Sequence, residues 1–419
     1  MKHGVTGRWF MVLAMTCPLP AQDATGPWQW AGFGTLGLAA TDTRQAGFLR
    51  DFTQPKGIYE HPDARTDTRL GLQLNGRLGE SLSCGVQFLT KYRYDGTFRP
   101  MLNAAYLAWN PTGNLELRAG RLNEEWNLTG DSRDVGYATT MVRPPVEFYA
   151  RNAANKFHGL DLASTFPAGA GNLRLKAWGG FLAEEQMPLP GGAPANYTGT
   201  RMGGAIAEWQ QGSLRVKLAW DFLHFTHKFP AKLQTLPDGL ASLAVSLQEP
   251  KLAVAATALS MDGTRGESLN AAVAYEQGPW QAQAELSRTT ANRVFLPDSW
   301  VGYALLAYRA GPLVPYGMFS RIVTHAPPAL DLGILPSVPG VGPATVGYVK
   351  TFVDYLHNNQ STATVGLRWD FRAKADLKFQ VDRVFANQTA GLWYQPQPGW
   401  NRRALVFSLT LDFVFGARH

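Results

Sequence analysis

Three things are scarce in this 419-residue sequence: cysteine, charge and long apolar runs. It holds two cysteines, Cys17 and Cys84, and only 17% of its residues are charged. A helix that crosses a bilayer needs about 20 consecutive apolar residues. One of the longest uncharged runs, residues 332–349, is interrupted by Pro336, Pro339 and Pro343. Proline at that density excludes a lipid-exposed helical span there.

Aromatic residues are abundant instead: 13 Trp, 22 Phe and 14 Tyr, beside a mean hydropathy of only −0.17. The clearest local pattern lies at residues 403–415, where Phe407, Leu409 and Leu411 alternate with Ser408 and Thr410. This period of two indicates a β-strand with one apolar and one polar face. A soluble sandwich and a membrane barrel both contain such strands, so this strand alone does not decide between them.

Residues 1–21 have the organisation of a secretory signal peptide. Lys2 and Arg8 precede a short apolar stretch, residues 9–15, and the small residue Ala21 ends the segment. Basic, apolar and small residues in this order predict export and cleavage, and leave a mature chain of residues 22–419 with Cys84 as its one cysteine, which excludes an intrachain disulfide. The net charge of +7 is not the clustered basic stripe of a nucleic-acid-binding protein, so no nucleic-acid partner is expected.

Amphipathic strands recur along the whole mature chain, in pairs that are joined by very short turns and separated by long polar loops. The count is about sixteen, an even number, as in single-chain bacterial membrane barrels. We therefore predict an all-β fold: one transmembrane antiparallel β-barrel in the bacterial outer membrane, with short periplasmic turns and long outer loops. The predicted strands are 28–41, 68–77, 83–94, 102–110, 114–122, 157–165, 172–182, 201–210, 214–225, 268–276, 280–288, 300–308, 314–324, 362–370, 375–384 and 403–415.

Two of the long loops carry features of their own. Residues 123–156 follow the fifth strand, which makes them the third outer loop, and they are rich in charge. The charged residues that we single out there are Arg133, Arg143, Arg151, Asp131 and Asp134. Residues 228–267 contain Leu240, Leu243 and Leu247 at helical spacing, which predicts a short helix. That helix either packs on the barrel rim or plugs its mouth.

Alternation also assigns charged side chains to the inside of the expected barrel. Opposed charges on a pore wall create a transverse field that favours small polar solutes, and the basic excess predicts a mild anion preference. The alternative is that many of these charges neutralise one another in pairs. The wall residues predicted to line the pore are Arg69, Arg77, Lys91, Arg93, Arg118, Glu116, Arg174, Lys176, Arg215, Lys217, Asp221, Arg368 and Lys378.

Four short stretches resemble the outer-membrane porin superfamily, in particular a porin-like branch near the phosphate-selective porins. They are residues 103–107 with 115–121; 131–137 with 143–145 and 148–149; 274–280 with 308–316; and 366–370 with 411–415. The resemblance implies a sixteen-stranded diffusion channel that forms a homotrimer, with the third outer loop folded into the pore as a constriction. The chain differs from the branch in lacking a concentrated Arg/Lys ladder and in carrying a tail, residues 416–419, after the terminal aromatic residue.

Other motifs give little support to catalysis. The match to G-x-G-x-x-G at residues 32–37 lies inside a predicted strand, whereas a dinucleotide site needs it between a strand and a helix. Glu124 and Glu125 are interpreted as solvated rim charges, and His224 and His227 point to opposite faces of a strand. We expect no enzymatic activity, no cofactor and no metal site.

The function predicted from the sequence is therefore passive diffusion of small anions or polar solutes through an outer-membrane porin. Its expected partners are outer-membrane lipid, the barrel assembly machinery and further copies of the same chain. The alternative is a barrel plugged by its long loops, which acts as a binding or adhesion module of the envelope.

Overall fold

The computed structural model of the protein describes residues 26–150, 155–182, 186–188, 194–325, 330–338, 342–386 and 392–416. The expected signal peptide, residues 1–21, and Arg151 lie outside these ranges.

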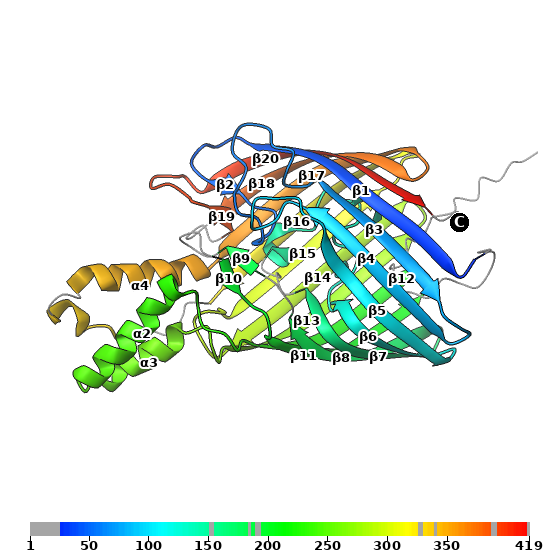
Figure 1. Ribbon diagram of the computed structural model, residues 1–419. Coiled ribbons are helices and arrows are strands. Elements are labelled where there is room, and N and C mark those ends of the chain that lie inside the picture. The colour runs from blue at the N-terminus through cyan, green and yellow to red at the C-terminus, as the bar shows by residue number, and fades with distance from the viewer. Residues whose placement is uncertain are drawn as a thin grey trace, which may run out of the picture.

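Sixteen antiparallel strands close into one barrel, in which β1 pairs with the last strand, β20 (Figure 1). The predicted fold class is confirmed. The barrel strands are β1 (Trp28–Thr41), β3 (Arg69–Arg77), β4 (Leu82–Lys91), β5 (Met101–Thr112), β6 (Leu115–Asn123), β7 (Lys156–Ala168), β8 (Gly171–Leu182), β11 (Arg201–Gln211), β12 (Leu214–His224), β13 (Arg265–Gln277), β14 (Trp280–Ala291), β15 (Ser299–Tyr308), β16 (Leu313–Thr324), β17 (Asn359–Arg372), β18 (Ala375–Ala386) and β20 (Arg403–Gly416).

Alternation along the strands gives the barrel an apolar outer face, whereas the inner face is polar on β3 and carries Tyr316, Met318 and Ile322 on β16. On β3, Leu70, Leu72 and Leu74 face outward with 40–48% of their surface exposed, whereas Arg69 and Gln73 face inward and are 3% and 7% exposed. Exposed leucines in a continuous outer band are unfavourable in water and favourable against lipid chains. The strand pattern thus produces both the fold and the surface that suits a bilayer.

The seam between β1 and β20 has an unusual construction. Gly32 pairs with Phe415 and Gly34 with Phe413 across the two strands. The two rings lie over the glycine backbone, so that a Cβ atom at either glycine would overlap ring carbons. Aromatic rings that cover strand glycines stabilise sheet edges and closure. The G-x-G-x-x-G match thus lies within a strand and serves the seam.

The connections are short at one end of the barrel, for example residues 212–213 and 278–279. At the other end the loops are long and carry helices: α2 (Ala231–Ser246) and α3 (Pro250–Leu259) between β12 and β13, and α4 (Gly342–Leu356) between β16 and β17. These three helices lie together at the end away from the C-terminus (Figure 1). None of the helices in the described residues is long and apolar enough to cross a membrane.

Helix α2 covers the stretch where a helix was expected, and α4 was not expected at all. The prolines of residues 332–349 argued against a membrane-spanning helix, and α4 is a shorter helix with Pro343 in its first turn, where proline is tolerated. Leu240 of α2, Leu252 of α3 and Phe352 of α4 share one apolar cluster with Trp178 of the inner wall. The helices therefore pack onto the mouth of the barrel.

Smaller elements occupy the same end. Two two-stranded sheets pair β2 (Gly47–Phe48) with β19 (Trp393–Tyr394), and β9 (Gln186–Pro188) with β10 (Pro194–Asn196). One short 3₁₀ helix, η2 (Leu335–Ser337), precedes α4.

Candidate functional site: the barrel lumen and its third loop

The described part of the third long loop, residues 124–150, lies inside the barrel. The loop contains η1 (Gly136–Ala138), which contacts β1 and β20, and α1 (Val146–Tyr149), which contacts β15, β16 and β17. Near its start, the Leu128 amide donates a hydrogen bond of 2.5 Å to Glu285 on β14. The loop therefore contacts strands on widely separated sides of the wall.

Glu125, which follows β6, anchors the start of this loop. Its carboxylate pairs with Arg118 at 2.6 Å, with Lys176 at 2.9 Å and with Arg174 at 3.1 Å. Asp161 on β7 shares Arg118 and Lys176 with it, at 2.5 and 2.7 Å. Burial by itself would raise the pKa of Glu125, but the surrounding cations outweigh burial and hold that pKa well below its usual range. The anchor is therefore ionised at neutral pH.

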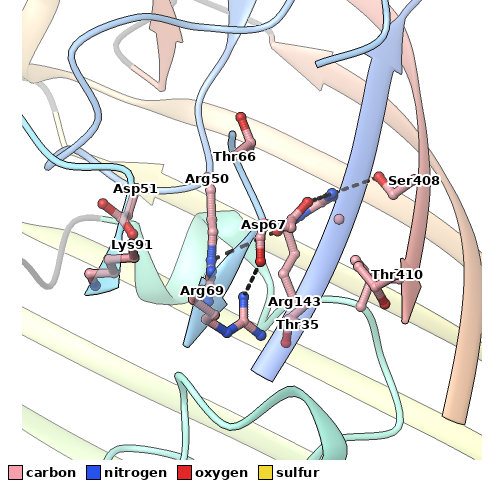
Figure 2. Close-up of polar contacts among 12 residues, drawn as sticks. Thr35, Arg50, Asp51, Thr66, Asp67, Arg69, Lys91, Arg143, Ser408 and Thr410 are labelled. Atoms are coloured by element: carbon pink, nitrogen blue, oxygen red, sulfur yellow. Dashed lines mark hydrogen bonds and ion pairs between the residues drawn. The ribbon is translucent and has the colours of Figure 1, made fainter. Parts of the chain in front are cut away.

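Arg143 anchors the middle of the loop close to the seam of the barrel. Its guanidinium is 1% exposed and donates to Asp67 at 2.6 and 3.2 Å, to Asp382 at 3.1 Å and to Ser408 at 2.6 Å. Asp67 precedes β3, whereas Asp382 and Ser408 lie on β18 and β20. Figure 2 shows Asp67 beside both Arg143 and Arg50, and Arg50 Nε lies 4.0 Å from it. One loop side chain thus ties together strands from both ends of the chain.

Two cations, Arg368 on β17 and Lys378 on β18, hold the loop by its backbone. Lys378 Nζ donates to the carbonyl of Gly136 at 2.6 Å, and Arg368 donates to the carbonyls of Tyr137 and Thr139 at 3.0 and 2.9 Å. These carbonyls are satisfied by full charges, which makes the bonds stronger than neutral ones. The acidic partners of the two cations are Asp370, Asp376 and Asp412.

Asp134 forms a further group with cations from three segments. Its carboxylate lies 3.5 Å from Lys91 and 3.7 Å from Arg50, and its carbonyl accepts a hydrogen bond of 2.6 Å from Arg69. Burial tends to raise the pKa of Asp134, but Lys91, Arg50 and the adjacent Arg133 together lower it. Arg133 itself donates to the Tyr149 carbonyl at 3.3 Å.

Two further predicted residues join the Glu125 anchor. Lys217 donates to the carbonyls of Glu125 and Asn127 at 3.0 and 3.1 Å and pairs with Glu208 at 3.0 Å. Glu116 lies 3.7 Å from Arg118. Arg215 and Asp131 are partly buried, and Asp221 is 6% exposed. Among the described residues, no cation forms an ion pair with Asp221.

Two of the predicted wall residues lie at the margins of the barrel. Arg77 is exposed at the end of β3. Arg93 lies beyond the strand expected to reach residue 94, because β4 ends at Lys91. Residues 93–97 form a tight turn instead, in which the Arg93 amide donates to the Thr97 carbonyl at 3.0 Å.

Sequence reasoning misjudged several loop anchors. Glu124 and Glu125 were interpreted as solvated rim charges, but they are 1% and 8% exposed. Glu147 was not singled out, although its buried carboxylate accepts hydrogen bonds from Ser320 at 2.6 Å and from Gln360 at 2.7 Å. Loop residues follow no strand period, so no sequence pattern indicates that these carboxylates are buried inside the barrel.

Comparison with known proteins agrees with this architecture at the level of the fold. No protein-family model and no curated protein matches the sequence. Among solved structures, the chain is similar to OmpT of Vibrio cholerae (TM-score 0.54, 11% identity, 94% of this chain and 99% of that one). It is also similar to an anion-selective porin from Comamonas acidovorans (0.54, 12%, 93% and 99%) and to the outer-membrane channel DcaP of Acinetobacter baumannii (0.52, 12%, 93% and 97%). The chain has the fold of outer-membrane porins, and no sequence match supports the phosphate-selective branch.

Proposed function

We propose that the protein is an outer-membrane porin, a passive diffusion channel for small hydrophilic solutes that is narrowed by its third loop. The observation that carries this proposal is the position of residues 124–150, which are held inside a closed barrel by buried ion pairs such as Arg143 with Asp67 and Glu125 with Arg118. A loop that is fixed to the barrel at two places gives the lumen a constant cross-section. A channel that selects solutes by size requires this. The channel-forming neighbours of the same fold give the proposal further support.

Replacement of the loop by a tight turn tests this proposal. Asn123 and Lys156 are paired residues of β6 and β7, and the Glu124 amide donates to the Asn155 carbonyl at 3.0 Å. A two-residue Asn-Gly turn can therefore join the two strands without disturbing the barrel. In planar bilayers we expect stepwise conductance from the complete protein and a several-fold larger conductance from the loop-replaced variant. Equal conductance of the two proteins would contradict the role of the loop as a constriction.

A plugged barrel that serves as a binding or adhesion module is the second candidate. It is favoured by the wide part of the barrel wall that the loop contacts, which includes Glu285 on β14 and Lys378 on β18. The same experiment separates the two functions. A complete protein without conductance, together with a conducting loop-replaced variant, identifies a plug.

We propose a mild anion preference for the open channel. Basic residues exceed acids among the inward positions predicted from the sequence, and one neighbour of the same fold is an anion-selective porin. Because many wall cations are paired with carboxylates, the preference should be a few-fold at most, which is under about 1 kcal/mol. The reversal potential in a salt gradient measures it. A clear cation preference would contradict the proposal.

The proposed setting is the bacterial outer membrane, reached after cleavage of residues 1–21 and insertion by the barrel assembly machinery. A homotrimer is part of the proposal, since a trimer form is known for the similar OmpT of Vibrio cholerae. No catalytic activity is proposed. Recovery of the protein in the soluble periplasm, with identical gel mobility before and after boiling, would contradict this setting.

A further inference from the structure

One patch of the inner wall carries several buried polar atoms. Within the described residues, no hydrogen-bond partner is found for Asp221 Oδ1 on β12, both amide atoms of Asn270 on β13, Ser287 Oγ on β14 and Trp178 Nε1 on β8. Their side chains are 6%, 3%, 2% and 8% exposed. A buried polar atom without a partner is costly, so several of them on one patch call for an explanation.

Strand register places these side chains together. Asn270 lies directly opposite Ser287, and such cross-strand pairs have Cβ atoms about 4.5–5.5 Å apart. Asp221 is the diagonal neighbour of Asn270, because it lies opposite Ser268. Trp178 is in register with Gly204, which in turn is in register with Asp221. A Cβ atom at Gly204 would come within 2.9 Å of Trp178 Nε1, so the indole N–H lies over this glycine, on the side of Asp221.

The unpartnered atoms include both donors and acceptors. Trp178 can only donate, the Asp221 carboxylate can only accept, and Asn270 and Ser287 can do both. A metal or ammonium ion would satisfy the acceptors alone, and an anion would be repelled by Asp221. A hydroxyl group donates and accepts at once. We propose that this patch is a binding subsite for a small, neutral, polyhydroxylated solute, which rests on the proposed channel function for the solute's passage through the lumen.

The third loop borders the subsite on its inner side. Lys217 Nζ donates to the carbonyl of Asn127 at 3.1 Å, and Glu285 accepts the Leu128 amide. Lys217 and Glu285 face Ala272, two residues along β13 from Asn270. The loop therefore narrows the lumen beside the patch. A solute that passes through the lumen is held close to the patch.

Permeation and binding together test the subsite. The complete mature protein is reconstituted in liposomes, and swelling is measured with glucose and with triethylene glycol, a neutral solute of similar size with fewer hydroxyls. The same protein in detergent is unfolded thermally with glucose or with methylammonium chloride. We expect glucose to permeate faster than triethylene glycol and to raise the unfolding midpoint. The Asp221→Ala and Asn270→Ala variants should lower the glucose rate by about tenfold and abolish the shift.

The Ser268→Ala variant is the matched control for Ser287→Ala, because the Ser268 hydroxyl already has a partner, Thr289, at 3.1 Å. Ser287→Ala should reduce the glucose effects and Ser268→Ala should retain them. Equal rates for both solutes in a conducting protein would overturn the subsite and leave the channel function standing. Absence of conductance would overturn the channel function, and the unfolding midpoint with glucose then decides on the subsite. A midpoint raised by methylammonium instead of glucose, or by neither, would show that the proposed solute class is wrong.

Discussion

Arg143 carries its positive charge where almost no solvent reaches it, between the carboxylates of Asp67, which precedes β3, and Asp382 on β18. Replacing Arg143 by Ala would leave Asp67 and Asp382 buried without their cation. Removal of one partner from a buried ion pair costs about 3–5 kcal/mol. We expect the free energy of unfolding in urea to fall by this amount, and the channel to conduct more because the middle of the loop is released.

Arg44→Ala is the control for this substitution. Arg44 also pairs with a carboxylate, that of Glu60, but its side chain is 78% exposed. Exposed ion pairs contribute about 0–1 kcal/mol, so the control should behave like the unaltered protein. A similar decrease in the free energy of unfolding of both variants would mean that the burial of Arg143 does not strengthen its contribution to stability.

The loop anchors Glu125 and Asp134 predict how the constriction responds to acid. Both have pKa values lowered by neighbouring cations that outweigh burial. A carboxylate with a lowered pKa stabilises the folded state above its ordinary pKa of about 4, and this contribution is lost as the pH falls through the lowered value. The stability that these two anchors contribute, measured as the difference in unfolding free energy between the unaltered protein and Glu125→Gln or Asp134→Asn, should therefore stay constant from pH 7 to about 4 and fall only below that range. A change between pH 7 and 5 would contradict this assignment.

The sequence predicted which way many side chains face but not what they touch. Arg118, Arg368 and Lys378 point inward, as their alternation with apolar neighbours requires. Their partners could not be predicted, because Arg118 lies 43 residues from Asp161, and Lys378 lies 242 residues from Gly136. Only the closed barrel with its inserted loop brings these residues together.

Among the elements, the short 3₁₀ helix η1 packs tightly against β1 and β20. A Cβ atom at Gly136 would overlap the Asp412 carboxylate and the Thr35 hydroxyl. Gly136→Ala should therefore push η1 away from β1 and β20, lower the free energy of unfolding by about 1–3 kcal/mol and alter the conductance. Gly113, whose added Cβ would meet no atom within 4 Å, provides the control variant Gly113→Ala. Unchanged conductance and stability in Gly136→Ala would show that η1 does not define the lumen.

Strands were easier to predict than loops for a physical reason. A strand with one face in lipid and one in the lumen must alternate, so the sixteen segments can be found from the sequence. The path of residues 124–150 and the helix α4 follow instead from contacts with the finished barrel. Pro343 lies in the first turn of α4, where proline is tolerated, but nothing in the sequence pattern marked that position as the start of a helix.

At the scale of the whole molecule, the outer apolar band makes the barrel more stable in a lipid bilayer than in water. Leu409 faces outward on β20 and is 41% exposed. Leu409→Arg should cost about 2–4 kcal/mol if the residue lies near the middle of the bilayer, measured by urea titration of the protein folded in lipid vesicles. Gln283→Arg, on the inner face of β14, should cost far less. Equal costs would mean that the two faces do not differ in their surroundings.

The seam of glycines and phenylalanines between β1 and β20 also determines when the barrel can close during folding. Near it, the Thr35 hydroxyl donates to Asp412, 377 residues further along the chain. Until the last strand has been synthesised, β1 therefore keeps an open edge, which invites pairing with other chains. Contacts of such long range also make folding slow. A chain that lacks its final fourteen-residue strand therefore cannot close the barrel, because β1 has no partner at the seam.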